Sequence, residues 1–324
     1  MTKNKVQNTI MKYGLIGHND VVIVALSGGF DSMCLLNILH ELGYQVQAAH
    51  LNHGIRACAD EDMAYVRQVT AHLGIKLYEE KQDVINYATD HKLSVETAGR
   101  MLRYAFFGRL AREHHASVAT AHNLNDNAES FIMHLLRGAG PSGLTGIRPY
   151  MILDGMTVIR PLIQVSRMEV EEYCKQNQLN PRNDETNDSC DYWRNEIRHM
   201  VMPPLIERGG LESIARTCEI LSCEDDFFEA YIKGLYEENT EKIDGSIKIS
   251  LKWLNNQHIA VRRRIIKIAI KMDWKHPITL LHIDAVISAC EKNYGGKIIQ
   301  LPGKINAIIK HGSLFLGGND IGCD

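Results

Sequence analysis

The sequence feature that most constrains the fold is an unbroken apolar run followed at once by a glycine-containing loop. Residues 21–26 are all apolar and rich in valine, which is typical of a strand buried on both faces of a parallel sheet. The loop Ser27-Gly28-Gly29-Phe30-Asp31-Ser32 interrupts this run. Apolar residues at helical spacing follow as far as Gly43, so the segment is predicted to form a strand, a loop and a helix.

The same alternation continues along the first part of the chain. We expect strands over residues 45–51, 76–80 and 117–121, and helices over residues 60–73, 94–115, 126–136 and 167–176. Alternating β and α elements predict an α/β fold with a doubly wound, Rossmann-like parallel sheet. Ligands of such sheets bind at the carboxyl ends of the strands, which is where the glycine loop lies.

The length of the chain indicates two domains. A chain of 324 residues is long for one core, because single domains typically have about 100–200 residues. We place the boundary before Gly209-Gly210, giving a larger domain of residues 1–208 and a smaller domain of residues 209–324. The second is expected to be mainly helical, with helices over residues 211–236, 253–272 and 279–293 and a β-hairpin over residues 297–316.

Composition excludes several classes of protein. Hydrophobic residues make up 45% of the chain, yet none of the apolar runs approaches the roughly 20 residues of a membrane span. The first 20 residues lack the apolar core of a signal peptide, so we expect a cytoplasmic protein. The eight cysteines include no Cys-x-x-Cys pair, which favours free thiols over a zinc site or disulfides. A net charge of −3 means that any contact with RNA must be local.

The glycine loop has the chemistry of a phosphate site. Its two glycines permit positive φ angles, so backbone N–H groups can converge on an anion at the start of the next helix. The loop is not a Walker A motif, because no Gly-Lys-Ser/Thr follows. Asp31 offers a carboxylate suited to Mg²⁺ on nucleotide phosphates. The alternative is an ordinary strand-to-helix turn capped by Asp31 or Ser32.

The loop resembles the pyrophosphate loop of the N-type ATP pyrophosphatases, which cleave ATP between the α and β phosphates and adenylate a substrate oxygen. Further motifs, in the same order, resemble the tRNA(Ile)-lysidine synthase family. They are His50-Leu-Asn-His-Gly-Ile-Arg56, Glu96-Thr-Ala-Gly-Arg-Met-Leu-Arg-Tyr-Ala-Phe-Phe107, Thr120-Ala-His-Asn123, Leu135-Leu-Arg-Gly138, Gly143-Leu-Thr-Gly146, Arg160-Pro-Leu162 and Arg194-Asn-Glu-Ile-Arg-His199. The resemblance spans residues 21–205 and implies that residues 27–32 bind ATP.

The resemblance also implies a catalytic cluster of His122, Asp126 and Glu129. Residues 126 and 129 are three apart and share one face of the expected helix. The alternative is a capping box, with Asp126 as N-cap and Glu129 at the third helical position. Asn125 and Asn127 stand where the family often has Asp and Gln, and an amide at residue 125 brings no charge for a metal.

Two groups of basic residues match further family positions. Arg100 and Arg103 match positions near the phosphates or the tRNA, and guanidinium groups would stabilise charge at the α-phosphate. Their alternative is a solvated face of an amphipathic helix. Arg194, Arg198 and His199 resemble the family's tRNA-contacting segment, with a plain basic helix end as the alternative.

Two more stretches are open to interpretation. Residues 180–191 are rich in Asn, Asp and Pro and are read as an exposed loop that handles substrate. Residues 262–271 carry a run of Arg and Lys, for which we favour a solvated helix face over contact with the RNA backbone.

The resemblance implies a two-step ligation. ATP, held with Mg²⁺, would adenylate the wobble cytidine of the isoleucine tRNA with a CAU anticodon and release pyrophosphate. The amine of L-lysine would then displace AMP at C2, and a carboxylate, Asp126 or Glu129, would accept its proton. An unstacked anticodon base is accessible without opening a duplex. The alternatives are a tRNA thiolase with the same adenylation chemistry and an inactive RNA-binding nucleotide module, and a homodimer is left open.

Overall fold

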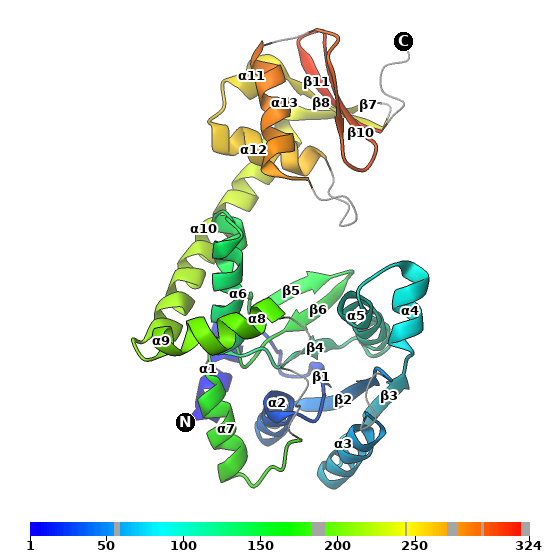
Figure 1. Cartoon of the computed structure of the whole chain (residues 1–324), viewed down its shortest axis with the longest axis vertical. Helices are drawn as coiled ribbons and strands as arrows, with labels where there is room; N and C mark the ends of the chain where they lie inside the picture. The colour runs from blue at the N-terminus through cyan, green and yellow to red at the C-terminus, as the bar shows by residue number, and fades with distance from the viewer. Residues whose placement is uncertain (55–58, 183–191, 244, 271–277, 293–294, 319–324) are drawn as a thin grey trace. The chain divides into compact units, whose positions relative to one another are not determined.

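The computed structural model describes residues 1–54, 59–182, 192–243, 245–270, 278–292 and 295–318. The chain divides into two compact units, Met1–Ser222 and Cys223–Asp324 (Figure 1). The division falls within one long helix, α10 (Gly210–Asn239). The boundary that the sequence suggested, before Gly209, coincides with the start of this helix and stays a prediction.

The first unit is built on a six-stranded sheet with strand order β3-β2-β1-β4-β6-β5. Its strands are β1 (Val21–Ala25), β2 (Gln45–Asn52), β3 (Leu77–Lys81), β4 (Ser117–Ala119), β5 (Tyr150–Leu153) and β6 (Met156–Ile159). All neighbours are parallel except β5, which pairs antiparallel with β6. The doubly wound α/β fold is therefore confirmed, whereas the hairpin of β5 and β6 was not predicted.

Helices surround this sheet (Figure 1). They are α1 (Thr2–Tyr13), α2 (Phe30–Glu41), α3 (Ala59–Leu73), α4 (Val84–His91), α5 (Val95–His114), α6 (Leu124–Leu136), α7 (Arg167–Gln176), α8 (Tyr192–Glu196) and α9 (Met202–Ile206). A π-helical turn, Ile197–Val201, joins α8 to α9, and a 3₁₀ turn covers Pro141–Thr145. Helices α1 and α4 were not predicted from the sequence. None of the helices in the described part of the chain is long and apolar enough to cross a membrane.

Burial of β1 on both faces fixes the position of the loop that follows it. Val22, Ile23 and Val24 are completely buried. Val22 and Val24 pack into a core with Leu35 and other residues of α2, whereas Ile23 packs on the opposite face with Phe106 of α5. Fully burying one such aliphatic side chain contributes about 1.5–3 kcal/mol. The glycine loop therefore leaves a strand that cannot shift without exposing two cores.

The second unit combines the end of α10 and further helices with a five-stranded antiparallel sheet of strand order β7-β8-β11-β10-β9. The elements are β7 (Thr240–Ile243), β8 (Ser246–Ser250), α11 (Leu251–Asn255), α12 (Ile259–Ala269), α13 (Leu280–Lys292), β9 (Ile298–Leu301), β10 (Ile305–Lys310) and β11 (Ser313–Gly317). The expected hairpin is present as β10 and β11, within a larger sheet whose strands β7 and β8 were not predicted. The single helix expected over residues 253–272 is divided, and its last two residues lie outside the described ranges.

Candidate active site

The hydroxyl group of Ser32 organises the glycine loop. Its Oγ accepts hydrogen bonds from the backbone N–H groups of Ser27 and Gly28, both at 3.2 Å, and it contacts the carbonyl of Gly29 at 3.1 Å. Gly28 has a φ of +90°, and a Cβ there would meet the ring of Tyr65 at 3.4 Å. A side chain at residue 28 would therefore be strained, which explains why glycine is required there.

The first turn of α2, which follows this loop, has no side-chain cap in the part of the chain that the structure describes. Gly29 is the N-cap residue, and among the described residues no side chain caps the turn. The alternative in which Asp31 or Ser32 caps an ordinary turn is therefore wrong. Uncapped N–H groups and the positive end of the helix dipole together attract an anion.

Asp31 belongs to this first turn and lies close to a second carboxylate, that of Asp126. Its Oδ1 accepts a 2.8 Å hydrogen bond from Nδ2 of Asn123. Burial, followed by the charge of Asp126, raises the pKa of Asp31 to about 6, although Asn123, Arg167 and Arg198 oppose this rise. The two carboxylates repel each other and lie beside an anion site. A cation bound there would be stabilised by the carboxylates and by the phosphate. The donor set therefore fits Mg²⁺.

Mg²⁺ does not require a cage made only of protein groups. Within the described ranges, no group of three or more His, Cys, Asp or Glu residues is placed to hold a metal ion. Mg²⁺ is commonly bound by one or two carboxylates together with phosphate oxygens. Asp31, with Asp126 nearby, meets this requirement.

Asp126 belongs to a capping box, but in a different register from the one considered above. The N-cap of α6 is Asn123, whose Oδ1 accepts from the N–H of Asp126 at 3.0 Å. The carboxylate of Asp126 in return accepts from the N–H of Asn123, also at 3.0 Å. The box with Asp126 as N-cap and Glu129 as its partner is wrong, because α6 begins at Leu124, two residues earlier than expected.

Glu129 is held by two arginines from a distant part of the chain. Its side chain is 1% exposed, and Nε of Arg194 and Nε of Arg198 contact its carboxylate at 2.9 and 2.8 Å. Burial disfavours the charged form of Glu129, but hydrogen bonds and charges from Arg198 and Arg194 outweigh it and lower its pKa. Glu129 is therefore an ionised structural anchor and a weak proton acceptor.

The same arginines also reach Asp126. Nη2 of Arg194 and of Arg198 lie 3.3 and 3.8 Å from its Oδ1. Arg167, at the start of α7, lies 3.9 Å from both carboxylates. Three guanidinium groups thus face two carboxylates, which leaves one net positive charge. Residues 194 and 198 were predicted to contact the tRNA, and no role was predicted for Arg167.

His122 lies in the same region but is held by a different residue. Its Nδ1 is 3.0 Å from the hydroxyl of Thr120. Burial lowers the pKa of His122 to about 4, with Arg160, Arg194 and Arg100 adding to this effect and Asp126 opposing it. The imidazole is therefore neutral at physiological pH and acts as a hydrogen-bonding group.

The remaining basic candidates are more exposed. The guanidinium of Arg100 stacks over the ring of Tyr104 at 5.6 Å, and Nη2 of Arg103 lies 3.2 Å from Nε2 of His53. His199 is also exposed. Arg160, by contrast, was predicted only as part of a motif and is buried: it is 5% exposed and donates to the carbonyl of residue 148 at 2.7 Å. The signal for this residue in the sequence was an arginine placed directly after the short apolar segment that ends at Ile159.

The two asparagines that depart from the family pattern have structural partners. Oδ1 of Asn125 accepts from the N–H of Arg167 at 2.9 Å, which secures the start of α7. Oδ1 of Asn127 accepts from the N–H of Ile147 at 2.6 Å. Neither amide is needed as a metal ligand in this arrangement.

Two regions named in the sequence analysis are only partly described. The turn-rich segment is described as far as Arg182, whose N–H donates to the carbonyl of Gly28 at 3.0 Å. This segment therefore begins against the phosphate loop, and residues 183–191 lie outside the described ranges. Ile55 and Arg56 of the quoted histidine motif also lie outside them.

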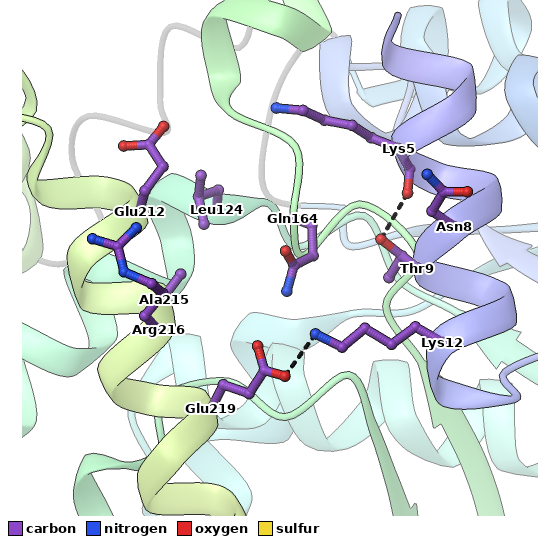
Figure 2. A pocket seen from close by; sticks show the side chains of 10 residues that line it. All are labelled: Lys5, Asn8, Thr9, Lys12, Leu124, Gln164, Glu212, Ala215, Arg216 and Glu219. Carbon is purple, nitrogen blue, oxygen red and sulfur yellow. Dashed lines mark hydrogen bonds and ion pairs between the residues drawn. The ribbon is translucent and has the colours of Figure 1, made fainter.

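A cavity of about 380 Å³ lies between α1 and the start of α10 (Figure 2). Its lining residues are Lys5, Asn8, Thr9, Lys12, Leu124, Gln164, Glu212, Ala215, Arg216 and Glu219. Its two lysines already form ion pairs, Lys12 with Glu219 and Lys5 with Glu169, each at 2.6 Å. None of the site residues predicted from the sequence lines this cavity, so we do not place the reaction there.

The basic run of the second unit is largely neutralised within that unit. Arg262 pairs with Glu291 at 2.7 Å, and Arg263 with Asp284 at 2.8 Å. Arg264 reaches a buried aspartate, Asp225, at 3.0 Å. These ion pairs favour the structural interpretation of residues 262–264 over a role in RNA binding.

The fold and the uncapped phosphate loop define a protein of the PP-loop class, and the family model described as the PP-loop domain matches residues 2–205. The chain is 38% identical to the tRNA(Ile)-lysidine synthase of Clostridium acetobutylicum, covering 97% of this chain and 69% of that protein. It is 35% identical to that of Dehalococcoides mccartyi, covering 98% and 70%. The chain belongs to the tRNA(Ile)-lysidine synthase family.

A solved structure shares the fold. The U34-tRNA thiolase of Methanococcus maripaludis, determined with its [4Fe-4S] cluster, has a TM-score of 0.57 and 22% identity. The similarity covers 68% of this chain and 78% of that one. At this level of identity the likeness concerns the fold alone.

Proposed function

We propose that this enzyme ligates L-lysine to C2 of the wobble cytidine in the isoleucine tRNA with a CAU anticodon. The reaction uses ATP and releases AMP and pyrophosphate. The observation that carries the proposal is the proximity of Asp31, on the phosphate loop, to the Asp126 and Glu129 cluster, joined through Asn123. Membership of the lysidine synthase family supports the choice of substrates.

In the adenylation step, residues 27–32 hold the phosphates of ATP. The backbone N–H groups of the first turn of α2, for which the described residues provide no side-chain cap, bind the anion. The guanidinium groups of Arg167, Arg194 and Arg198 stabilise charge that builds up as pyrophosphate leaves. Asp31 would hold Mg²⁺, which would neutralise charge on the phosphates and so favour attack of the cytidine oxygen on the α-phosphate.

The second step needs a group that accepts a proton from the lysine amine. Glu129 is poorly suited, because its side chain is 1% exposed and two arginines bind its carboxylate. Asp126 is 15% exposed and has longer contacts with the same arginines. We therefore assign the role of proton acceptor to Asp126. Neutral His122 would hydrogen-bond the cytidine or the amine without adding charge.

We assign Arg100 and Arg103, whose side chains are exposed, to binding the phosphates of the tRNA backbone near the site. Exposed guanidinium groups bind phosphate oxygens with two parallel hydrogen bonds. His199 is proposed to contact the tRNA as well. A cytoplasmic location follows from the proposed tRNA substrate.

Product analysis tests the adenylation chemistry. The enzyme, incubated with ATP, Mg²⁺, L-lysine and the tRNA transcript, is expected to form AMP and pyrophosphate in equal amounts. Release of ADP and phosphate instead would contradict the proposal. A brown, iron-containing preparation that transfers sulfur to the tRNA would replace it by the thiolase alternative, and ATP binding without turnover would indicate the inactive RNA-binding alternative.

A further inference from the structure

Asn123 connects the two halves of the site. It lies in the short connection between β4 and α6, is completely buried and is the N-cap of α6. Its Nδ2 donates to Oδ1 of Asp31 at 2.8 Å, and its Oδ1 accepts from the N–H of Asp126 at 3.0 Å. One short side chain therefore bonds to the phosphate loop at one end and to the catalytic helix at the other.

The orientation of this amide follows from its partners. An ionised carboxylate can accept hydrogen bonds but cannot donate them, and a backbone N–H can donate but cannot accept. The Asn123 amide must therefore present its NH₂ group to Asp31 and its oxygen to Asp126. The topology brings these residues together, because β1 and β4 are parallel neighbours in register at Val24 and Ala119.

We infer that Asn123 is a positioning residue that fixes the Asp31 carboxylate for Mg²⁺ while it caps α6. With Oδ1 of Asp31 engaged by the amide, Oδ2 is the oxygen assigned to the cation. The inference rests on the proposed function, since it assumes that Asp31 meets a cation on the nucleotide. Removing the amide would let the Asp31 side chain turn away from the phosphates.

A purely structural role as helix cap is the competing explanation, and Asn123→Ser separates the two. Serine is an N-cap residue as good as asparagine, but its hydroxyl lacks the reach and the NH₂ group needed for Asp31. Asn123→Ala loses both functions. A positioning role predicts that the two variants share a defect in Mg²⁺ use, whereas a capping role predicts a defect for alanine alone.

Asn127→Ser is the matched control. Asn127 is also a buried asparagine on α6, and its Oδ1 accepts from the N–H of Ile147 at 2.6 Å. This replacement removes a buried amide from the same helix without touching Asp31. It is expected to lower the melting temperature and to leave the Mg²⁺ dependence unchanged.

The experiment is calorimetric binding of α,β-methylene-ATP to the full chain over a range of Mg²⁺ concentrations, with melting temperatures measured in parallel. The Mg²⁺ concentration for half-maximal binding is expected to rise about tenfold or more in Asn123→Ser and Asn123→Ala. It should stay within twofold of wild type in Asn127→Ser. If Asn123→Ser does not fold, Asn123→Thr replaces it, since threonine also caps.

Two outcomes are distinguishable. Wild-type Mg²⁺ dependence in folded Asn123→Ser would overturn the inference and leave the proposed function intact. If wild type itself fails to bind the nucleotide analogue, the proposed function fails together with the inference.

Discussion

Arg198 and Glu129 form a two-point ion pair in which Nε and Nη2 of the arginine lie 2.8 and 3.0 Å from Oε1 and Oε2 of the glutamate. The two residues are 69 positions apart, and the carboxylate is 1% exposed. Such a fork contact fixes both side chains in direction as well as in distance. The segment that carries Arg194 and Arg198 is therefore held against the buried carboxylate of Glu129 and forms part of the candidate site.

Arg198→Ala is expected to lower the free energy of unfolding by about 2–3 kcal/mol, measured by urea denaturation. Losing one partner of a buried pair typically costs about 3–5 kcal/mol, and Arg194 remains to compensate in part. Arg216→Ala, which removes an exposed arginine from α10, should change the value by less than about 0.5 kcal/mol. Equal stability of the two variants would contradict the anchoring role of Arg198.

Asp31→Ala is expected to reduce pyrophosphate release at least about 100-fold while the protein stays folded. The carboxylate is the proposed cation ligand beside the uncapped turn of α2, and electrostatic stabilisation of this kind is worth roughly that factor. Asp90→Ala, at an exposed position of α4, serves as the control. Unchanged turnover in Asp31→Ala would refute the phosphate-site assignment.

Gly28→Ala is expected to lose about 1–2 kcal/mol more stability than Gly29→Ala. Residue 28 has a φ of +90°, whereas residue 29 has a φ of −79° that any residue adopts. The Cβ of alanine would also meet the ring of Tyr65 at 3.4 Å at the first position, but only Ser27 Oγ at 3.6 Å at the second. Thermal unfolding of both variants checks the difference, and similar melting temperatures would argue against the strained loop.

His122 should remain neutral well below the pH at which a histidine in an unfolded chain titrates. Burial lowers its pKa to about 4, from an ordinary value of about 6.5. Because the unfolded chain binds the proton more tightly, His122 makes the fold less stable as the pH falls from about 6.5 to about 4. NMR titration of the imidazole measures this directly, with His122→Asn identifying the signal. Protonation near pH 6.5 in the folded protein would contradict the burial argument.

Most of the catalytic framework could be predicted because it depends on local pattern. The apolar strand before Ser27 and the two glycines indicated a phosphate loop at a strand end, and the structure has that loop. The partners of Glu129 could not be predicted in the same way, since a single sequence gives no measure of which distant arginine meets which carboxylate. Arg198 was assigned to tRNA contact and Arg167 was not singled out, whereas the fold places both beside Glu129.

The errors also have local causes. The start of α6 was placed at Asp126 because that residue is itself a good cap, whereas Asn123 makes the cap and bonds to Asp31 as well. The strands β7 and β8 are short and follow a long helix directly, so their few residues gave little alternation to detect.

The central claim is tested most directly by incorporation of radiolabelled lysine into tRNA. The transcript of the isoleucine tRNA with a CAU anticodon is compared with one in which the wobble cytidine is replaced, each with and without ATP. We predict label only in the first transcript and only with ATP, in an acid-stable linkage to the tRNA. Absence of label under conditions in which the enzyme binds ATP, or equal labelling of both transcripts, would contradict the assignment.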